Sequence, residues 1–135
     1  MAAWTIRREL HNPPHPFEAR LNTLEDLRGW LKQLCEEGDS NFHLENEATH
    51  DELTVLMDRP LAAISFMRSD TTAFSASTDP NFESNKDEDH HEFDLGGTPT
   101  PVSKDRCISF DAMVRIVEYT FLHATLPSWI GWRQP

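Results

Sequence analysis

Cysteine, glycine and long apolar runs are all scarce in this chain of 135 residues. The two cysteines, Cys35 and Cys107, stand in apolar surroundings without the spacing of a metal site. This favours buried free thiols in a reducing compartment, and a disulfide between the two remains an alternative. No stretch approaches about 18 apolar residues, and the N-terminus lacks a basic segment followed by an apolar run. We therefore predict no signal peptide, no membrane span and a cytoplasmic location.

Positive charge is also in short supply, because 12 basic residues face 23 acidic ones and the net charge is −11. A surface of this sign repels nucleic acid and anionic membranes, so neither is expected as a direct ligand, whereas a basic protein would be attracted. The length is that of one domain, and a hydrophobic fraction of 38% is typical of a globular protein. We expect one domain over residues 1–135.

The chain also lacks the local signatures of catalysis. Gly96-Gly97 is followed by Thr-Pro instead of a helix, which does not suit a phosphate-binding loop. Cys107 precedes a predicted helix whose dipole could activate a thiol, but its apolar neighbour Ile108 favours a buried structural cysteine. We expect no enzyme activity and no cofactor.

One polar cluster could hold a metal ion, the run of acids and histidines at 87–92. Carboxylates and imidazoles are ordinary ligands of divalent ions, so a metal-dependent enzyme that uses His90 and His91 is an alternative hypothesis. Adjacent ligands in a loop do not converge as two histidines one helical turn apart would. A solvated charge run with no metal is the interpretation that we favour.

The central feature of the sequence is the stretch 53–67, in which two apolar runs rich in strand-forming residues flank Asp58-Arg59-Pro60. This pattern predicts a hairpin of two inner strands. Further strands are expected at 3–10, 41–45 and 71–77, and a short one at 93–95, with a stop at 12–16 and a turn at 96–101. Consecutive strands of this kind predict an antiparallel meander.

Two helices are predicted, at 23–37 and 109–124. Thr23 with Asp26 and Ser109 with Asp111 provide N-terminal caps, and Gly38 is expected to end the first helix. The apolar stripes of the two helices contain Leu24, Leu27, Trp30, Leu31, Leu34, Phe110, Met113, Val114, Val117 and Phe121. The predicted fold class is α+β, an antiparallel meander sheet with two main helices packed on it in a single domain. The aromatic end of the chain, 127–132, is expected to fold back on the core.

The order of these elements resembles that of the Imm-one family, the immunity proteins of bacterial polymorphic toxin systems. The similarity runs from about residue 20 to the C-terminus. It is strongest in Cys107-Ile-Ser-Phe-Asp-Ala-Met113 and in Phe121-Leu-His-Ala-Thr-Leu-Pro127 through to Trp132. The resemblance implies a small cytoplasmic antitoxin that binds and inhibits a cognate secreted toxin, often a deaminase that acts on nucleic acid bases, or a nuclease.

The charge of the chain agrees with such a partner, because a toxin that handles nucleic acid needs a basic cleft that carboxylates can block. The acidic loop at about 78–101 can be a mobile solubilising segment or a recognition surface, and a non-inhibitory adaptor for a basic protein is a further alternative. Trp30, Phe110, Phe121 and Trp129 are predicted to be core, and Trp132 core or binding. The predicted toxin-binding residues are Asp70, Phe74, Asp79, Phe82, Glu83, Asp87, Glu88, Asp89, Glu92, Asp94 and Trp132.

Overall fold

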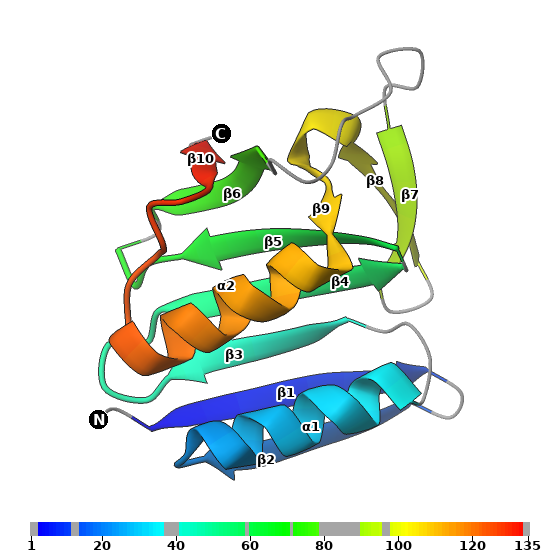
Figure 1. The fold of residues 1–135 in the computed structure, drawn as a ribbon. Helices are drawn as coiled ribbons and strands as arrows, with labels where there is room; N and C mark the ends of the chain where they lie inside the picture. The colour runs from blue at the N-terminus through cyan, green and yellow to red at the C-terminus, as the bar shows by residue number, and fades with distance from the viewer. Residues whose placement is uncertain are drawn as a thin grey trace.

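The protein is built on one large antiparallel sheet, seen here in a computed structural model that describes residues 3–11, 14–36, 41–58, 60–70, 72–78, 90–95 and 98–133. The strands follow the order β10-β6-β5-β4-β3-β1-β2 across the sheet (Figure 1). Their bounds are β1 (Trp4–His11), β2 (Pro14–Leu21), β3 (Phe42–Asn46), β4 (Glu52–Asp58), β5 (Leu61–Met67), β6 (Ala73–Thr78) and β10 (Gly131–Arg133). Strands β3 to β6 form the predicted meander, and the short β9 (Ile108–Ser109) pairs with β5.

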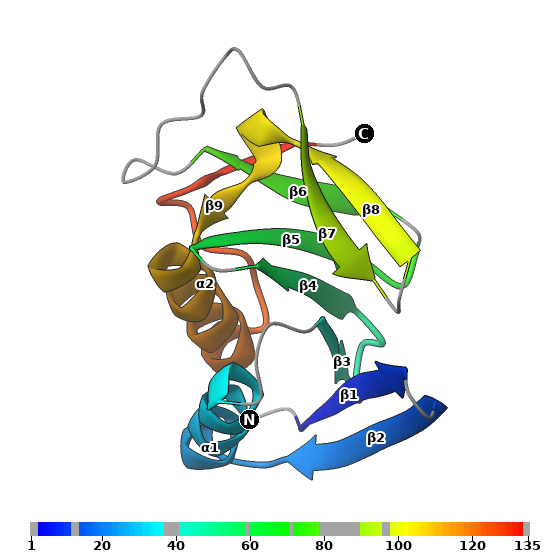
Figure 2. The same ribbon diagram turned by 90° about the vertical axis from the view of Figure 1, so that its right-hand side faces the viewer.

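The two faces of this sheet are covered differently. Both helices, α1 (Leu24–Glu36) and α2 (Phe110–His123), lie on one face. A separate hairpin of β7 (His90–Leu95) and β8 (Thr98–Ser103) lies on the other face, where a short 3-10 helix, η1 (Lys104–Arg106), follows it (Figure 2). The predicted α+β fold with two helices on an antiparallel meander is therefore confirmed.

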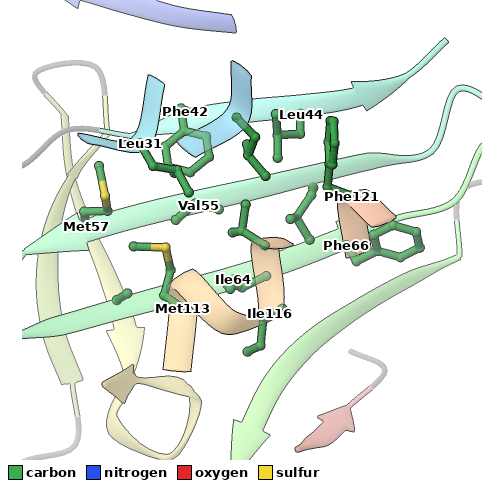
Figure 3. Close-up of a cluster of buried hydrophobic side chains, with 14 of the residues drawn as sticks. Leu31, Phe42, Leu44, Val55, Met57, Ile64, Phe66, Met113, Ile116 and Phe121 are labelled. Carbon is green, nitrogen blue, oxygen red and sulfur yellow. The ribbon is translucent and has the colours of Figure 1, made fainter. Parts of the chain in front are cut away.

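The main core lies between the sheet and the helices. Alternate side chains of β4 and β5 point toward the helices, as the central hairpin predicts, and Val55 and Ile64 are cross-strand partners within it. Met113, Ile116 and Phe121 of α2 close over them (Figure 3). Burial of so many large apolar side chains is the main favourable term for this fold.

Both helix starts are capped as predicted. Asp26 N donates to Thr23 Oγ1 at 3.1 Å, and Thr23 N donates back to the Asp26 carboxylate at 3.2 Å, which forms a capping box. At the second helix, Ala112 N donates to Ser109 Oγ at 3.1 Å. Gly38, the predicted end of the first helix, lies outside the described residues.

Two strands contradict the sequence prediction. The stop expected at 12–16 is partly wrong, because β2 begins at Pro14, and the turn expected at 96–101 is partly wrong, because β8 occupies Thr98–Ser103. Proline has no backbone N–H to donate to a neighbouring strand, so the prolines in these two segments favoured a loop over a strand. Both strands lie at sheet edges, where proline is tolerated.

Predicted core aromatics differ in burial. Phe121 is fully buried, whereas Trp30, Phe110 and Trp129 are half-buried and pack at the margin of the core, so the core prediction overstates their burial. The guanidinium of Arg115 lies 4.4 Å from the centre of the Trp129 ring and covers part of it.

A second, smaller core lies beneath the β7–β8 hairpin. It contains Leu56, Leu61 and Ala63 from the sheet, together with Phe93 and Cys107. Cys107 is a buried free thiol, and burial raises the pKa of this thiol above its usual value. The disulfide alternative for Cys107 is therefore wrong. Neither described helix is long and apolar enough to cross a membrane.

Candidate functional site

Six of the predicted toxin-binding residues, Asp79, Phe82, Glu83, Asp87, Glu88 and Asp89, lie outside the described part of the chain. The structure does place the two ends of the segment that contains them. Thr78, just before it, pairs with Gly131 at the β6–β10 edge of the sheet. His90, just after it, pairs with Ser103 at the start of the β7–β8 hairpin. The acidic segment therefore joins one edge of the main sheet to the hairpin on its open face.

The β6–β10 edge brings two further predicted residues together. Trp132 pairs with Ala76 of β6, and Phe74 lies two residues along that strand, so both aromatic rings stand on the same face. Both side chains are half-buried against the main core. The indole Nε1 of Trp132 donates to the Pro127 carbonyl oxygen at 2.9 Å, which fixes the orientation of the ring.

Arg68 supports the same edge. Its guanidinium lies 5.7 Å from the centre of the Phe74 ring and 5.9 Å from that of Phe66, close enough for a cation–π contact with both. The positive charge of Arg68 therefore faces aromatic rings. A partner would meet an aromatic surface that is already ordered, which lowers the entropy lost on binding.

Asp70 lies in the turn between β5 and β6. Its carboxylate accepts a hydrogen bond from Thr72 N at 2.9 Å, and this bond holds the pKa of Asp70 below its usual value. The side chain is exposed and stays charged at neutral pH. Asp70 thus both closes the turn and presents a negative charge at the far end of β6 from the acidic segment.

The remaining predicted acids belong to the hairpin. Phe93 is buried against the open face of the sheet, so its neighbour Glu92 points away from the sheet and is exposed. Asp94 is also on β7, and its side chain lies outside the described part of the structure. Phe74 and Trp132 pack against the core on the helix side of the sheet. The β7–β8 hairpin, which carries Glu92, lies on the opposite side (Figure 2). The predicted site therefore does not form one flat face in the described residues.

Within the described part of the chain, His90 and His91 do not belong to a metal site. His91 Nε2 lies 2.7 Å from the Asp58 carboxylate, and its ring packs edge-on against Phe93, with 4.8 Å between the ring centres. His90 is exposed. Across the described ranges, no group of three or more His, Cys, Asp or Glu side chains is arranged to hold a metal ion. His91 instead links β7 to β4.

One polar surface was not predicted, a charged row across the open face of β1, β3 and β4. Arg7, His43 and Thr54 are successive cross-strand partners there. Arg7 Nη2 lies 2.8 Å from a Glu52 carboxylate oxygen and 3.5 Å from one of Glu45, and His43 Nδ1 lies 2.9 Å from Thr54 Oγ1. The polar alternation of these strands is visible in the sequence, but which strands are neighbours is not. Arg7 is paired with two carboxylates, so this row has no surplus of positive charge to attract an anionic ligand.

The chain matches no protein-family model and no curated protein sequence. The resemblance to the Imm-one family therefore depends on the patterned positions quoted above.

Proposed function

We propose that this protein is an immunity protein, a cytoplasmic inhibitor that binds a cognate secreted toxin with a basic active cleft. The observation that supports this most directly is the place of Thr78, the last described residue before the acidic stretch 79–89 of the sequence. Thr78 pairs with Gly131 on the strand pair that carries Phe74 and Trp132. Negative charge and ordered aromatic surface are thereby connected at one edge of a compact scaffold.

The charge of the protein supports the same proposal. A net charge of −11 on 135 residues sets up a long-range field that attracts a cationic partner. A toxin that acts on nucleic acid, such as a deaminase or a nuclease, holds phosphates with basic side chains. Carboxylates of the segment can occupy the places of those phosphates and block access to the cleft.

The two kinds of side chain have different roles in this proposal. Exposed carboxylates increase the association rate, because electrostatic attraction acts before contact. Half-buried aromatic rings such as Phe74 and Trp132 slow dissociation, because a partner that covers them removes apolar area from water. Salt should therefore change the association rate of the complex far more than its dissociation rate.

The proposal predicts that a neighbouring gene encodes a large secreted protein with a toxin domain, and the direct test is co-expression of this protein with that domain. Survival of the bacteria with the protein, and death without it, supports the proposal. Binding without protection would identify a non-inhibitory adaptor instead, and absence of both binding and protection would refute the proposal.

The acidic segment is tested by association kinetics with the purified toxin domain. Asp87→Asn, Glu88→Gln and Asp89→Asn together should slow association about tenfold at low salt and flatten its salt dependence. A matched control neutralises three exposed acids on β2 and α1, far from this edge, and changes the net charge equally: Glu18→Gln, Glu25→Gln and Glu36→Gln. Equal slowing in both triple variants would show that only total charge matters and would remove the segment from the site.

A further inference from the structure

A pocket of about 150 Å³ lies on the open face of the sheet, between the sheet and the segment formed by β8 and η1. Its floor includes Ser65 of β5 and Ser75 of β6, and its far wall includes Val102, Ser103 and Arg106. Segments far apart in the sequence meet here, because the hairpin returns the chain over the sheet (Figure 2). None of the residues that line the pocket belongs to the proposed toxin-binding set.

Arg106 is the exceptional side chain of this pocket. Its Nε atom is buried and has no hydrogen-bond partner. Over the described ranges, no acidic side chain forms an ion pair with its guanidinium. Buried polar atoms are nearly always hydrogen-bonded, and an unsatisfied charged donor is costly. Within the described residues, the positively charged guanidinium of Arg106 therefore has no acceptor.

Two hydroxyl groups complete the polar lining. Ser65 and Ser75 are direct cross-strand partners, so their side chains stand next to each other on the open face. Neither hydroxyl is hydrogen-bonded to another residue within the described segments. The third serine, Ser103, already donates to the Asp105 carboxylate. Two free hydroxyl donors and one guanidinium thus line a single small pocket, whose remaining walls include the apolar Leu56 and Val102.

We propose that this pocket binds a compact oxyanion of about four to six non-hydrogen atoms, such as a short-chain carboxylate or inorganic phosphate. The size follows from the volume, because a protein cavity of roughly 150 Å³ holds one benzene molecule. The anionic oxygens accept from Arg106 and from the hydroxyls of Ser65 and Ser75, and a short apolar chain can contact Leu56 and Val102. Arginine suits this role because its planar donors match carboxylate and phosphate oxygens.

The overall negative charge of the protein weakens this binding. Asp105 is close to the pocket through its bond to Ser103, and the net charge of −11 repels anions from the surface. We therefore expect dissociation constants in the millimolar range. The site is independent of the proposed antitoxin function, and it is tested without any toxin.

The test is a titration of the full ¹⁵N-labelled chain, followed by amide chemical shifts at constant ionic strength. The probes are sodium propionate, inorganic phosphate and propionamide, a neutral molecule of nearly the same shape as propionate. Saturable shifts near Ser65, Ser75 and Ser103 with the two anions, and none with propionamide, support the proposal. A tighter response to propionate indicates a carboxylate ligand, and a tighter response to phosphate indicates a phosphate ligand.

Variants assign the binding to the pocket. Arg106→Gln should raise the dissociation constant at least about tenfold, and Ser75→Ala about threefold, because they remove a charged and a neutral donor. Arg20→Gln on the distant strand β2 makes the same change of charge at an exposed side chain and should leave binding unchanged. If Arg106→Gln fails to fold, Ser75→Ala decides the outcome. Absence of saturable shifts, equal shifts with propionamide, or unchanged binding in Arg106→Gln would overturn the proposal.

Discussion

Gly29 in α1 and Ala124 at the end of α2 each occupy a position at which the other residue type would make the helix more stable. Gly29 lies within α1 on its exposed side, and a Cβ added there would have no atom within 4 Å. Ala124 ends α2 in the left-handed conformation, with φ 55° and ψ 28°. Glycine is unfavourable inside a helix, and a residue with a Cβ is unfavourable in the left-handed region. Exchanging the two residues should therefore stabilise both helices.

The expected size of the effect follows from the two positions. Gly29→Ala should increase the free energy of unfolding by about 0.8–1.0 kcal/mol, the difference in helix propensity at an exposed site. Ala124→Gly should add about 0.5–1 kcal/mol, because the strain that is relieved exceeds the extra entropy of an unfolded glycine. The sites lie in different helices and should act additively. For a chain of this length the double variant should melt roughly 5–7 °C higher.

The assay is thermal and urea unfolding of the parent, both single variants and the double variant, which has the same composition and charge as the parent. Ala124→Val is the control for conformation, since a β-branched residue is strained further in the left-handed region and should lower the melting temperature. A destabilised Gly29→Ala variant would show that position 29 is crowded. A destabilised Ala124→Gly variant would show that α2 does not end in this conformation.

Two further predictions concern buried and titrating groups. The Thr120 hydroxyl is buried without a hydrogen-bond partner in the described structure, so Thr120→Val should raise the free energy of unfolding by about 1 kcal/mol in urea denaturation, whereas Thr120→Ser should lower it. Asp26 has a pKa below its ordinary 3.8, chiefly because the Asn22 N–H donates to its carboxylate. Its stabilising effect should be present above pH 3.8 and disappear as the pH falls through the lowered pKa. In the Asp26→Asn variant, the free energy of unfolding measured against pH should no longer show this loss at acid pH. An unchanged loss would contradict the assignment to Asp26.

Local signals account for the parts of the fold that the sequence predicts well. The capping box of Thr23 and Asp26 and the Ser109 cap depend on residues within one helical turn, so they are readable without the fold. The same holds for the alternation in the central hairpin. Strand β2 could not be predicted this way, because Pro14 and Pro16 act as strand breakers except at an edge, and edge position is a property of the whole sheet.

The candidate sites are harder still to predict from local sequence, because the fold brings their residues together. The acidic segment was predictable because its members are adjacent in the sequence. The pocket was not, since Ser65 and Ser75 become neighbours only through the β5–β6 register, and Arg106 reaches them only because the chain returns over the sheet. Likewise, Trp132 joins Phe74 through the β6–β10 pairing, although nearly sixty residues separate them.

The unequal covering of the sheet explains how folding stability and ligand binding in the pocket can be kept apart in so short a chain. Most of the largest buried side chains, among them Trp4, Phe42, Phe66 and Phe121, belong to the core on the helix side, whereas Phe93 lies beneath the hairpin. Among the described residues, the apolar cluster of the opposite face is small and lies beneath the hairpin, so other side chains of this face are free to be polar. Substitutions at Ser65, Ser75 or Arg106 therefore remove little buried apolar area and should change binding far more than they change folding.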